Sequence, residues 1–502
     1  MRVSFNLKSF IKNTFIYGFS SVLARILNFL LTPLYVRSFD TNEYGTIVLL
    51  FSWASILNAI LAFGMETSFF RFLFDKYSKR QIYTNSFFVV FAISLLFILL
   101  TNTFIDPISQ YIIPNYKNTN EYLLYIRLFS FILFFDAITI IPLAYLRARG
   151  MALRYSMIKA LNIGIYIFLN ILFIVFIPYY IKEQLPHYEI ISRYYKADWV
   201  GYVFIANLIS SAFSLLLLAK EFKKVIFKYV NISVISKLTK YSWPIMIANL
   251  SFIINENIDK IMLAKLLPDN ISEQEVGIYG ACSKIAIFLN IAIQAFRLGA
   301  EPIFFKHSKE QDANKLYANI MLYFVIAISI VAMIINTNIP ILKYFIKAND
   351  AVNEHLYWSG LKVVPILLFA YICLGIYMNL SIWYKLGNKT QYGLYISGIG
   401  AIITITLNFI LIPKYGYTGS AVTTLIVYFV MMSISYMVGQ KHKYIPYNVR
   451  KICGYIILCI VINLLFFYTP SIHILLKNVG IAVIIATIIL YEYKTFNSQP
   501  KY

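Results

Sequence analysis

The chain has 502 residues, of which 60% are hydrophobic and 13% are charged, whereas a typical soluble domain is about 45–50% apolar and about 25% charged. A soluble core cannot bury such an excess, so the composition excludes a soluble globular enzyme. The net charge of +22 lies mainly in short polar loops, where basic residues set membrane orientation, and we therefore expect no nucleic-acid partner.

Hydropathy along the chain predicts an all-α integral membrane protein with about 14 transmembrane helices, because apolar runs close to the roughly 20 residues that cross a bilayer recur throughout. The predicted spans are residues 13–37, 44–65, 84–104, 122–145, 155–177, 199–219, 241–264, 276–296, 316–337, 358–383, 392–412, 417–439, 451–468 and 473–491. Lys and Arg gather in the two termini and in the even-numbered loops. The positive-inside rule then predicts that both termini are cytoplasmic.

The loops between the predicted spans are too short to hold a soluble domain, and the longest outer loop is Pro178–Asp198. The sequence has neither a His/Cys/Asp catalytic cluster nor a Gly-rich phosphate-binding loop. The protein must therefore work inside its helix bundle. This favours transport over catalysis, with no cofactor and no direct use of ATP.

An internal repeat relates the first six spans to the next six. Three short segments recur at a nearly constant spacing: Glu66–Arg71 as Glu301–Lys306, Glu43–Gly45 as Glu275–Gly277, and Leu169–Asn170 as Leu407–Asn408. Six intervening spans preserve orientation, so the halves form two lobes related by an axis along the membrane normal. Parallel repeats of this kind occur in transporters that rock one lobe against the other around a central site.

The repeat predicts four regions of the chain. We expect an N-terminal lobe of spans 1–6 over residues 1–219 and a basic cytoplasmic linker over 220–240. A C-terminal lobe of spans 7–12 should follow over 241–440. Spans 13 and 14, with a cytoplasmic tail, occupy 441–502 and lie outside the repeat.

Several stretches resemble one family of membrane transporters. They are Tyr241–Pro244 with Asn255 and Asp259–Lys260, Val276–Tyr279 with Gln294–Phe296 and Pro302, Gly375–Tyr384 with Lys389–Thr390, and Tyr415–Lys443. These residues are similar to the polysaccharide-transport (oligosaccharide flippase) family of the multidrug/oligosaccharidyl-lipid/polysaccharide exporter superfamily. The resemblance implies a flippase that moves undecaprenyl-diphosphate-linked oligosaccharide across the bacterial inner membrane by alternating access. The product would feed the synthesis of O-antigen, capsule or exopolysaccharide, with membrane lipids and a polysaccharide polymerase complex as further partners.

Two basic residues lie deep inside predicted spans, Arg25 in span 1 and Lys284 in span 8. A charge at that depth costs about 2.5–3.5 kcal/mol on insertion scales, so each should face a wet cavity or a partner. The planar fork of Arg suits a diphosphate and Lys supplies a point charge, and the resemblance implies basic residues that line a central cavity. We expect both to bind substrate; the alternative is an internal salt bridge, for example to Asp136.

Two further basic residues, Arg127 and Lys362, lie near the outer ends of spans 4 and 10. Their long side chains reach either the membrane interface or the outer rim of the substrate cavity. Both are therefore included among the substrate-binding candidates.

Two acidic residues are candidates for ion coupling, Asp136 at the middle of span 4 and Asp259 in span 7. A buried carboxylate can carry a proton or a sodium ion. Asp136 has an equal alternative, which is to neutralise Arg25 or Arg127. In span 7 the i,i+4 spacing of Glu256 and Lys260 predicts a pair, which leaves Asp259 without an intrahelical partner.

The repeated segments supply the gating candidates, which are Glu66 with Arg71 and Glu301 with Lys306. Both sets lie at predicted cytoplasmic helix ends. They form either a symmetric ionic latch across the cytoplasmic mouth or ordinary interfacial pairs.

Three other functions remain open on the sequence. A multidrug cation exporter of the same superfamily would favour an acidic and aromatic cavity, whereas the deep charges here include Arg25 and Lys284. A membrane glycan polymerase or ligase needs a sizeable outer loop with a catalytic Arg or His, and His187 is the only histidine in a long outer loop of the first lobe. A structural or scramblase role makes no specific demand on the sequence.

Overall fold

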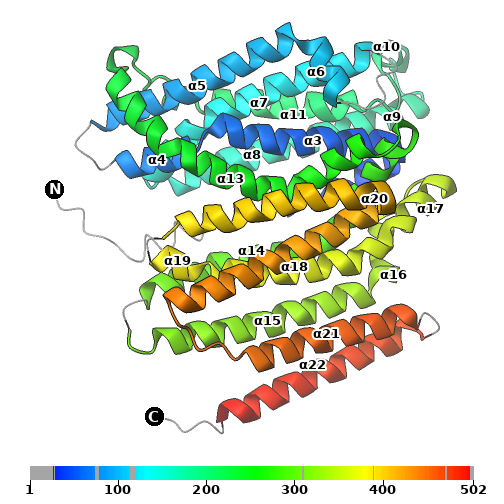
Figure 1. Cartoon of the computed structure of the whole chain (residues 1–502). Coiled ribbons are helices and arrows are strands. Elements are labelled where there is room, and N and C mark those ends of the chain that lie inside the picture. The colour runs from blue at the N-terminus through cyan, green and yellow to red at the C-terminus, as the bar shows by residue number, and fades with distance from the viewer. Residues whose placement is uncertain are drawn as a thin grey trace.

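The computed structural model describes residues 26–27, 29–73, 78–112, 119–307, 310–387, 389–469 and 472–497. Within these ranges every regular element is a helix. Ten of the described helices are long and apolar enough to cross a membrane. Figure 1 shows the long helices lying side by side, so the chain passes back and forth between the two ends of a bundle.

The first lobe opens with α2 and α3, which are separated by Phe39 and Asp40. Its helices are α2 (Thr32–Ser38), α3 (Thr41–Ala62), α4 (Met65–Phe72), α5 (Lys79–Thr103), α6 (Ile105–Ile112), α7 (Thr119–Ala148), α8 (Ala152–Ile171), α9 (Ile177–Lys182), α10 (Tyr188–Tyr194), α11 (Gly201–Leu217) and α12 (Ala219–Phe222). A capping box starts α3, because the Asp40 carboxylate accepts from the Glu43 backbone N–H and the Glu43 carboxylate accepts from the Asp40 N–H. Two consecutive residues with positive φ, Phe63 and Gly64, end it before α4 begins.

The second lobe and the two last spans complete the bundle. Their helices are α13 (Ile232–Leu266), α14 (Asp269–Lys306), α15 (Ala313–Thr337), α16 (Ile339–Leu342), α17 (Ala351–Ser359), α18 (Val363–Leu380), α19 (Ile382–Leu386), α20 (Gln391–His442), α21 (Val449–Tyr468) and α22 (Ile474–Asn497). The long α20 is two spans joined at Gly416, whose φ of 56° is non-helical, and its two arms run back along each other (Figure 1). A side chain at Gly416 would adopt this left-handed conformation only with strain.

The predicted membrane fold is confirmed by this arrangement. Predicted spans 2 to 14 coincide with long helices, spans 11 and 12 being the two arms of α20. Most of the first predicted span lies outside the described residues, and its last residues form α2. One boundary differs, because α13 begins at Ile232 inside the predicted 220–240 linker. The Asn231 side chain accepts from the backbone N–H groups of Ser233 and Val234 and so caps the helix.

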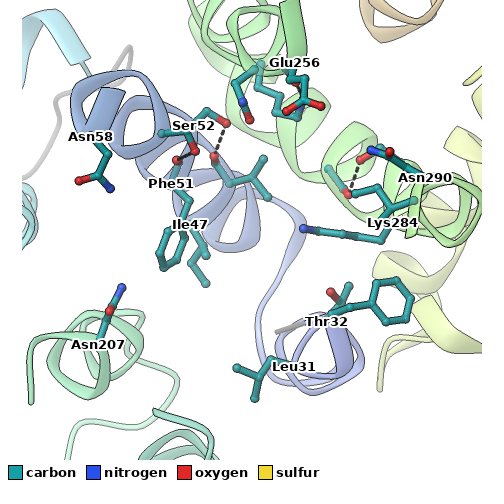
Figure 2. A pocket seen from close by; sticks show the side chains of 18 of the residues that line it. Leu31, Thr32, Ile47, Phe51, Ser52, Asn58, Asn207, Glu256, Lys284 and Asn290 are labelled. Carbon is teal, nitrogen blue, oxygen red and sulfur yellow. Dashed lines mark hydrogen bonds between the residues drawn. The ribbon is translucent and has the colours of Figure 1, made fainter. Parts of the chain in front are cut away.

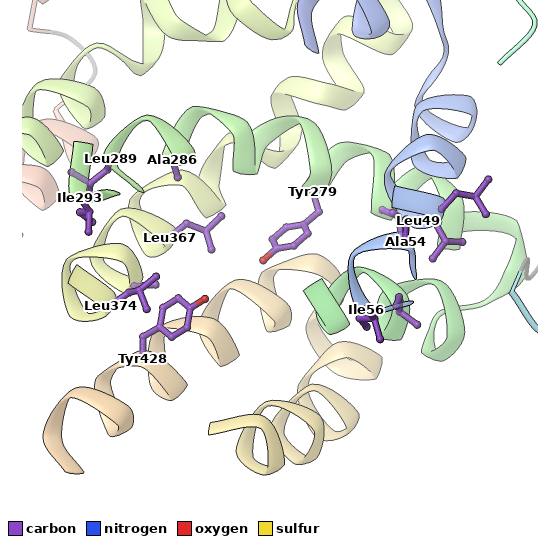
Figure 3. Close-up of a cluster of buried hydrophobic side chains, with 14 of the residues drawn as sticks. Leu49, Ala54, Ile56, Tyr279, Ala286, Leu289, Ile293, Leu367, Leu374 and Tyr428 are labelled. Carbon is purple, nitrogen blue, oxygen red and sulfur yellow. The ribbon is translucent and has the colours of Figure 1, made fainter. Parts of the chain in front are cut away.

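We name the two ends of the bundle after the short helices found there. The α4 end holds α4, the last turn of α7 and the first turn of α8, and the α17 end holds α17 and the first turns of α3 and α14 (Figure 1). Between them, one hydrophobic cluster runs through both lobes. Figure 3 shows part of it, with Leu49 and Ile56 of α3 on one side and Leu289 of α14 and Leu367 of α18 on the other.

The backbones of the two lobes approach each other closely at two glycines at the α17 end. A Cβ atom on Gly45 of α3 would lie 1.9 Å from the carbonyl oxygen of Glu273, and one on Gly277 of α14 would lie 2.0 Å from that of Thr41. These glycines are equivalent positions of the sequence repeat. The two equivalent helices therefore cross with their backbones in contact, which only residues without a Cβ permit.

Candidate functional site

A cavity of about 910 Å³ lies between the two lobes. The first lobe contributes residues of α2, α3, α4, α7, α8 and α11 to its wall, and the second lobe contributes residues of α13, α14, α18 and α20. Its described charged residues are Glu66, Asp136, Arg147, Lys159, Glu256, Asp259, Lys260 and Lys284. A membrane-embedded wall with this many charges has to meet water or a polar ligand, so the cavity is the candidate functional site.

Asp136 of α7 provides the first lobe's central carboxylate. Ser211 of α11 donates a hydrogen bond of 2.7 Å to its Oδ1 atom, whereas no described residue donates to Oδ2. Lys159 of α8 also lines the cavity and acts on Asp136 electrostatically. The carboxylate therefore has an available oxygen and a nearby cation.

Both carboxylate oxygens of Asp259 in α13 accept hydrogen bonds, unlike those of Asp136. Its Oδ1 accepts from the Lys260 ammonium at 2.8 Å and from the Lys260 backbone N–H at 2.9 Å, and its Oδ2 accepts from the Tyr279 hydroxyl at 2.8 Å. The expectation that Asp259 lacks an intrahelical partner is therefore wrong. The long side chain of Lys260 folds back onto the residue before it, and its ammonium also donates to the backbone oxygen of Glu256.

Lys284 of α14 reaches into the cavity from the second lobe, as Figure 2 shows. No carboxylate in the described part of the chain forms an ion pair with it, and the charged neighbour that acts on it is Lys260, another cation. Two ammonium groups of one lobe therefore face the same space, and one of them is already paired with Asp259. The arrangement suits an anionic ligand.

Glu66 pairs with Arg147, not with the predicted Arg71. Glu66 lies in the first turn of α4 and Arg147 in the last turn of α7, so both partners of this ion pair belong to the first lobe. Arg71 lies exposed on the last turn of α4. It does not meet Glu66, because residues five apart point to different faces of a helix. A pair within one lobe cannot by itself latch two lobes together.

The other predicted site residues lie away from the described cavity wall. Arg127 is exposed on α7, and Lys362 is exposed with its ammonium 5.0 Å from the ring centre of Tyr417. Neither residue is among the described residues that line the cavity, and contact of either with substrate stays a prediction. Arg25 lies outside the described residues, as do the side chains of Glu301 and Lys306.

Sequence reasoning missed two cavity cations, Arg147 and Lys159. Arg147 follows the end of predicted span 4, and Lys159 lies near the start of predicted span 5. A signal was present, because Lys159 lies one helical turn inside an apolar run. The span boundary alone could not show that both side chains turn toward the lobe interface.

Hydrogen bonds join the two lobes at the α17 end. The Tyr357 hydroxyl of α17 donates to the backbone oxygen of Asp40 at 3.1 Å, and its ring lies 6.1 Å from that of Tyr44. The Thr41 backbone N–H donates to Asn353 Oδ1 at 3.2 Å. Asn353 in turn donates from its backbone and side chain to Asp350, and these bonds lower the pKa of the Asp350 carboxyl.

The fold matches those of solved transporters. A lipid II flippase, MurJ, in an inward closed conformation superposes with a TM-score of 0.70 at 14% identity over 95% of this chain and 99% of its own. A multidrug resistance MATE family transporter of the MOP superfamily in an inward-facing conformation gives a TM-score of 0.60 at 14% identity over 83% and 94%. The protein therefore has the MOP-superfamily transporter fold.

Sequence comparisons agree with the fold. An uncharacterized membrane protein of Methanocaldococcus jannaschii is 25% identical over 234 residues, and this match spans 44% of the chain and about half, 53%, of that relative. Residues 244–410 match the MatE family, and residues 10–307 match the family described as "Polysaccharide biosynthesis protein". The latter match covers more than half of the chain and most of both cavity walls, so this multi-pass membrane protein belongs to the polysaccharide biosynthesis protein family.

Proposed function

We propose that this protein is a flippase that translocates undecaprenyl-diphosphate-linked oligosaccharide across the bacterial inner membrane by alternating access, and that it is not an enzyme. The observation that carries the proposal is the cavity between the lobes, into which Lys284 points without an ion-pair partner among the described residues. A lipid diphosphate is an anion that can enter from the membrane and meet this ammonium. A polysaccharide polymerase is the proposed partner that uses the flipped lipid.

The position of Lys284 favours an anionic cargo over a multidrug cation. The described lining residues include equal numbers of acidic and basic side chains: Glu66, Asp136, Glu256 and Asp259 against Arg147, Lys159, Lys260 and Lys284. Ion pairs join Glu66 to Arg147 and Asp259 to Lys260, whereas no described carboxylate forms an ion pair with Lys284. Arg25, in the predicted first span, is proposed as the second group that binds the diphosphate, because a bidentate guanidinium and an ammonium together match its charge.

Lys284→Gln is expected to lower transport about ten- to hundredfold, because a charge-assisted hydrogen bond to the diphosphate contributes about 1.5–3 kcal/mol. The measurement is flipping of undecaprenyl-diphosphate-linked oligosaccharide in proteoliposomes. Lys477→Gln is the matched control, since this buried lysine lies on α22 outside the cavity and donates to the Phe466 backbone oxygen. Equal losses in both variants would show that removing any buried lysine damages the fold.

Deletion of the gene tests the cargo itself. We expect lipid-linked oligosaccharide to accumulate on the cytoplasmic leaflet while its synthesis continues. Normal surface polysaccharide and an even distribution of the lipid between leaflets would contradict a flippase and favour a structural role.

The proposed orientation places both termini and the α4 end in the cytoplasm, because basic residues gather in the loops there. Lys228 near α13 and Lys182 of α9 are both exposed and lie at opposite ends of the bundle. In a variant without the four native cysteines, a membrane-impermeant thiol reagent added outside should label Lys182→Cys and miss Lys228→Cys. The opposite labelling pattern would reverse the direction of transport.

A further inference from the structure

Two asparagine side chains of the first lobe face the cavity and have no hydrogen-bond partner in the described part of the chain. Asn58 of α3 and Asn207 of α11 both line it, and Figure 2 shows their amides pointing toward the space between them. No described residue forms a hydrogen bond with either amide. Each amide keeps two N–H donors and an acceptor oxygen for a ligand or for water.

A third asparagine on the same wall, Asn162, has a structural role, because its amide forms hydrogen bonds between two helices. The Asn162 side chain donates to the backbone oxygen of Ser210 and to the hydroxyl of Ser214, both at 2.9 Å. These hydrogen bonds link α8 to α11. The amides of Asn58 and Asn207 form no such link with a described residue, so helix packing does not explain why polar side chains lie at these two positions.

An aromatic ring lies on the same face of α3 as Asn58. Phe51 precedes Asn58 by seven residues, which is two helical turns, and it lines the cavity with Ser55 between them. Its ring is held by edge-to-face and tilted contacts with Phe129 and Phe204, at 5.4 and 6.3 Å between ring centres. A fixed ring beside two open amides offers an apolar face together with donors and acceptors.

We propose that Asn58, Asn207 and Phe51 form a sugar-binding subsite, which holds the first sugars of the lipid-linked glycan while Lys284 holds the diphosphate. A pyranose has hydroxyl groups around its edge and C–H groups on its faces, so amides can bind the edge and an aromatic ring can cover a face. Figure 2 shows Lys284 on the opposite side of the cavity from both amides. This places the subsite across from the ammonium, as a sugar attached to a diphosphate requires.

The inference rests on the proposed function, and two probes separate them. One is undecaprenyl diphosphate without sugar, and the other is the lipid-linked oligosaccharide isolated from cells that make this protein. Equilibrium binding of both probes is measured with the full-length protein in lipid nanodiscs. Asn58→Leu and Asn207→Leu should each weaken binding of the oligosaccharide lipid about three- to tenfold, which corresponds to the loss of one or two hydrogen bonds.

The same variants should bind undecaprenyl diphosphate within about twofold of the unchanged protein, which also shows that they are folded. Lys284→Gln should weaken both probes alike. Asn58→Gln and Asn207→Gln, which keep the amide, should restore part of the lost affinity.

If the asparagine-to-leucine variants lose affinity for both probes equally or for neither, the proposed sugar subsite is wrong. It is also wrong if the unchanged protein binds both probes with equal affinity. If the unchanged protein binds neither probe, the proposed function fails.

Discussion

Alanine in place of Gly45 or Gly277 is expected to push the two lobes apart at the α17 end and to slow transport. An added methyl group would meet a carbonyl oxygen of the other helix at about 2 Å, and helices forced apart in a packed interface lose about 1–3 kcal/mol, or about five- to 150-fold in the equilibrium. Because the two glycines occupy equivalent positions, either substitution should act in the same direction.

The measurement combines flipping in proteoliposomes with labelling of a cavity residue. Ser283 lines the cavity and is buried, so Ser283→Cys in a background without native cysteines should resist an impermeant thiol reagent added at the α17 end. Gly45→Ala or Gly277→Ala should expose it.

Two other helical glycines provide matched controls. Gly164 of α8 and Gly398 of α20 have no neighbouring atom within 4 Å of an added Cβ. Alanine there should leave transport and labelling unchanged, since its only effect is to reduce the conformational entropy that the backbone loses on folding. If Gly45→Ala behaves like these controls, the glycine crossing does not close the α17 end.

The helices and their repeat were readable from the sequence because each transmembrane span must satisfy its backbone internally and present an apolar surface. The equivalence of Gly45 and Gly277 was also visible in the repeated sequence segments. The sequence did not predict that their helices touch at these residues, since a repeat shows which positions correspond but not which of them meet between the lobes. The positive φ at Gly416 likewise shows only in the structure, where it separates two spans that the hydropathy had already counted.

The ion pairs of the cavity were less predictable than the helices. Spacing along one helix suggested that Lys260 pairs with Glu256, and the repeated segment placed Glu66 close to Arg71. In the structure Lys260 pairs with Asp259, and Glu66 pairs with Arg147. Pairing between helices depends on how each helix is rotated about its axis, which hydropathy does not fix. Long side chains add to the difficulty, because an ammonium on a four-carbon stem can reach a neighbour one residue away.

The two carboxylates predicted to couple transport to an ion differ in how many of their oxygens already accept hydrogen bonds. Alternating access driven by an ion gradient needs a group whose occupancy differs between the two states, because an ion shifts an equilibrium only through differential affinity. Asp136 has an oxygen that no described residue occupies, whereas both oxygens of Asp259 accept hydrogen bonds from Lys260 or Tyr279. We therefore propose Asp136 as the residue that takes up the proton or sodium ion, with Lys159 balancing its charge when no ion is bound.

Asp136→Asn is expected to abolish gradient-driven flipping while leaving substrate binding within about twofold, because the amide mimics the neutral, loaded carboxyl group and cannot change charge. Flipping of the lipid-linked oligosaccharide is measured in proteoliposomes with an imposed proton or sodium gradient. Asp259→Asn is the comparison in the other lobe, and it should keep its response to the gradient even if the lost Lys260 pair lowers the amount of folded protein. A full gradient response in Asp136→Asn would remove Asp136 from coupling, and its loss in Asp259→Asn alone would move coupling to the second lobe. If the unchanged protein ignores both gradients, transport runs down the gradient of the substrate itself, and Asp136 and Lys159 then serve only to balance charge in the wall.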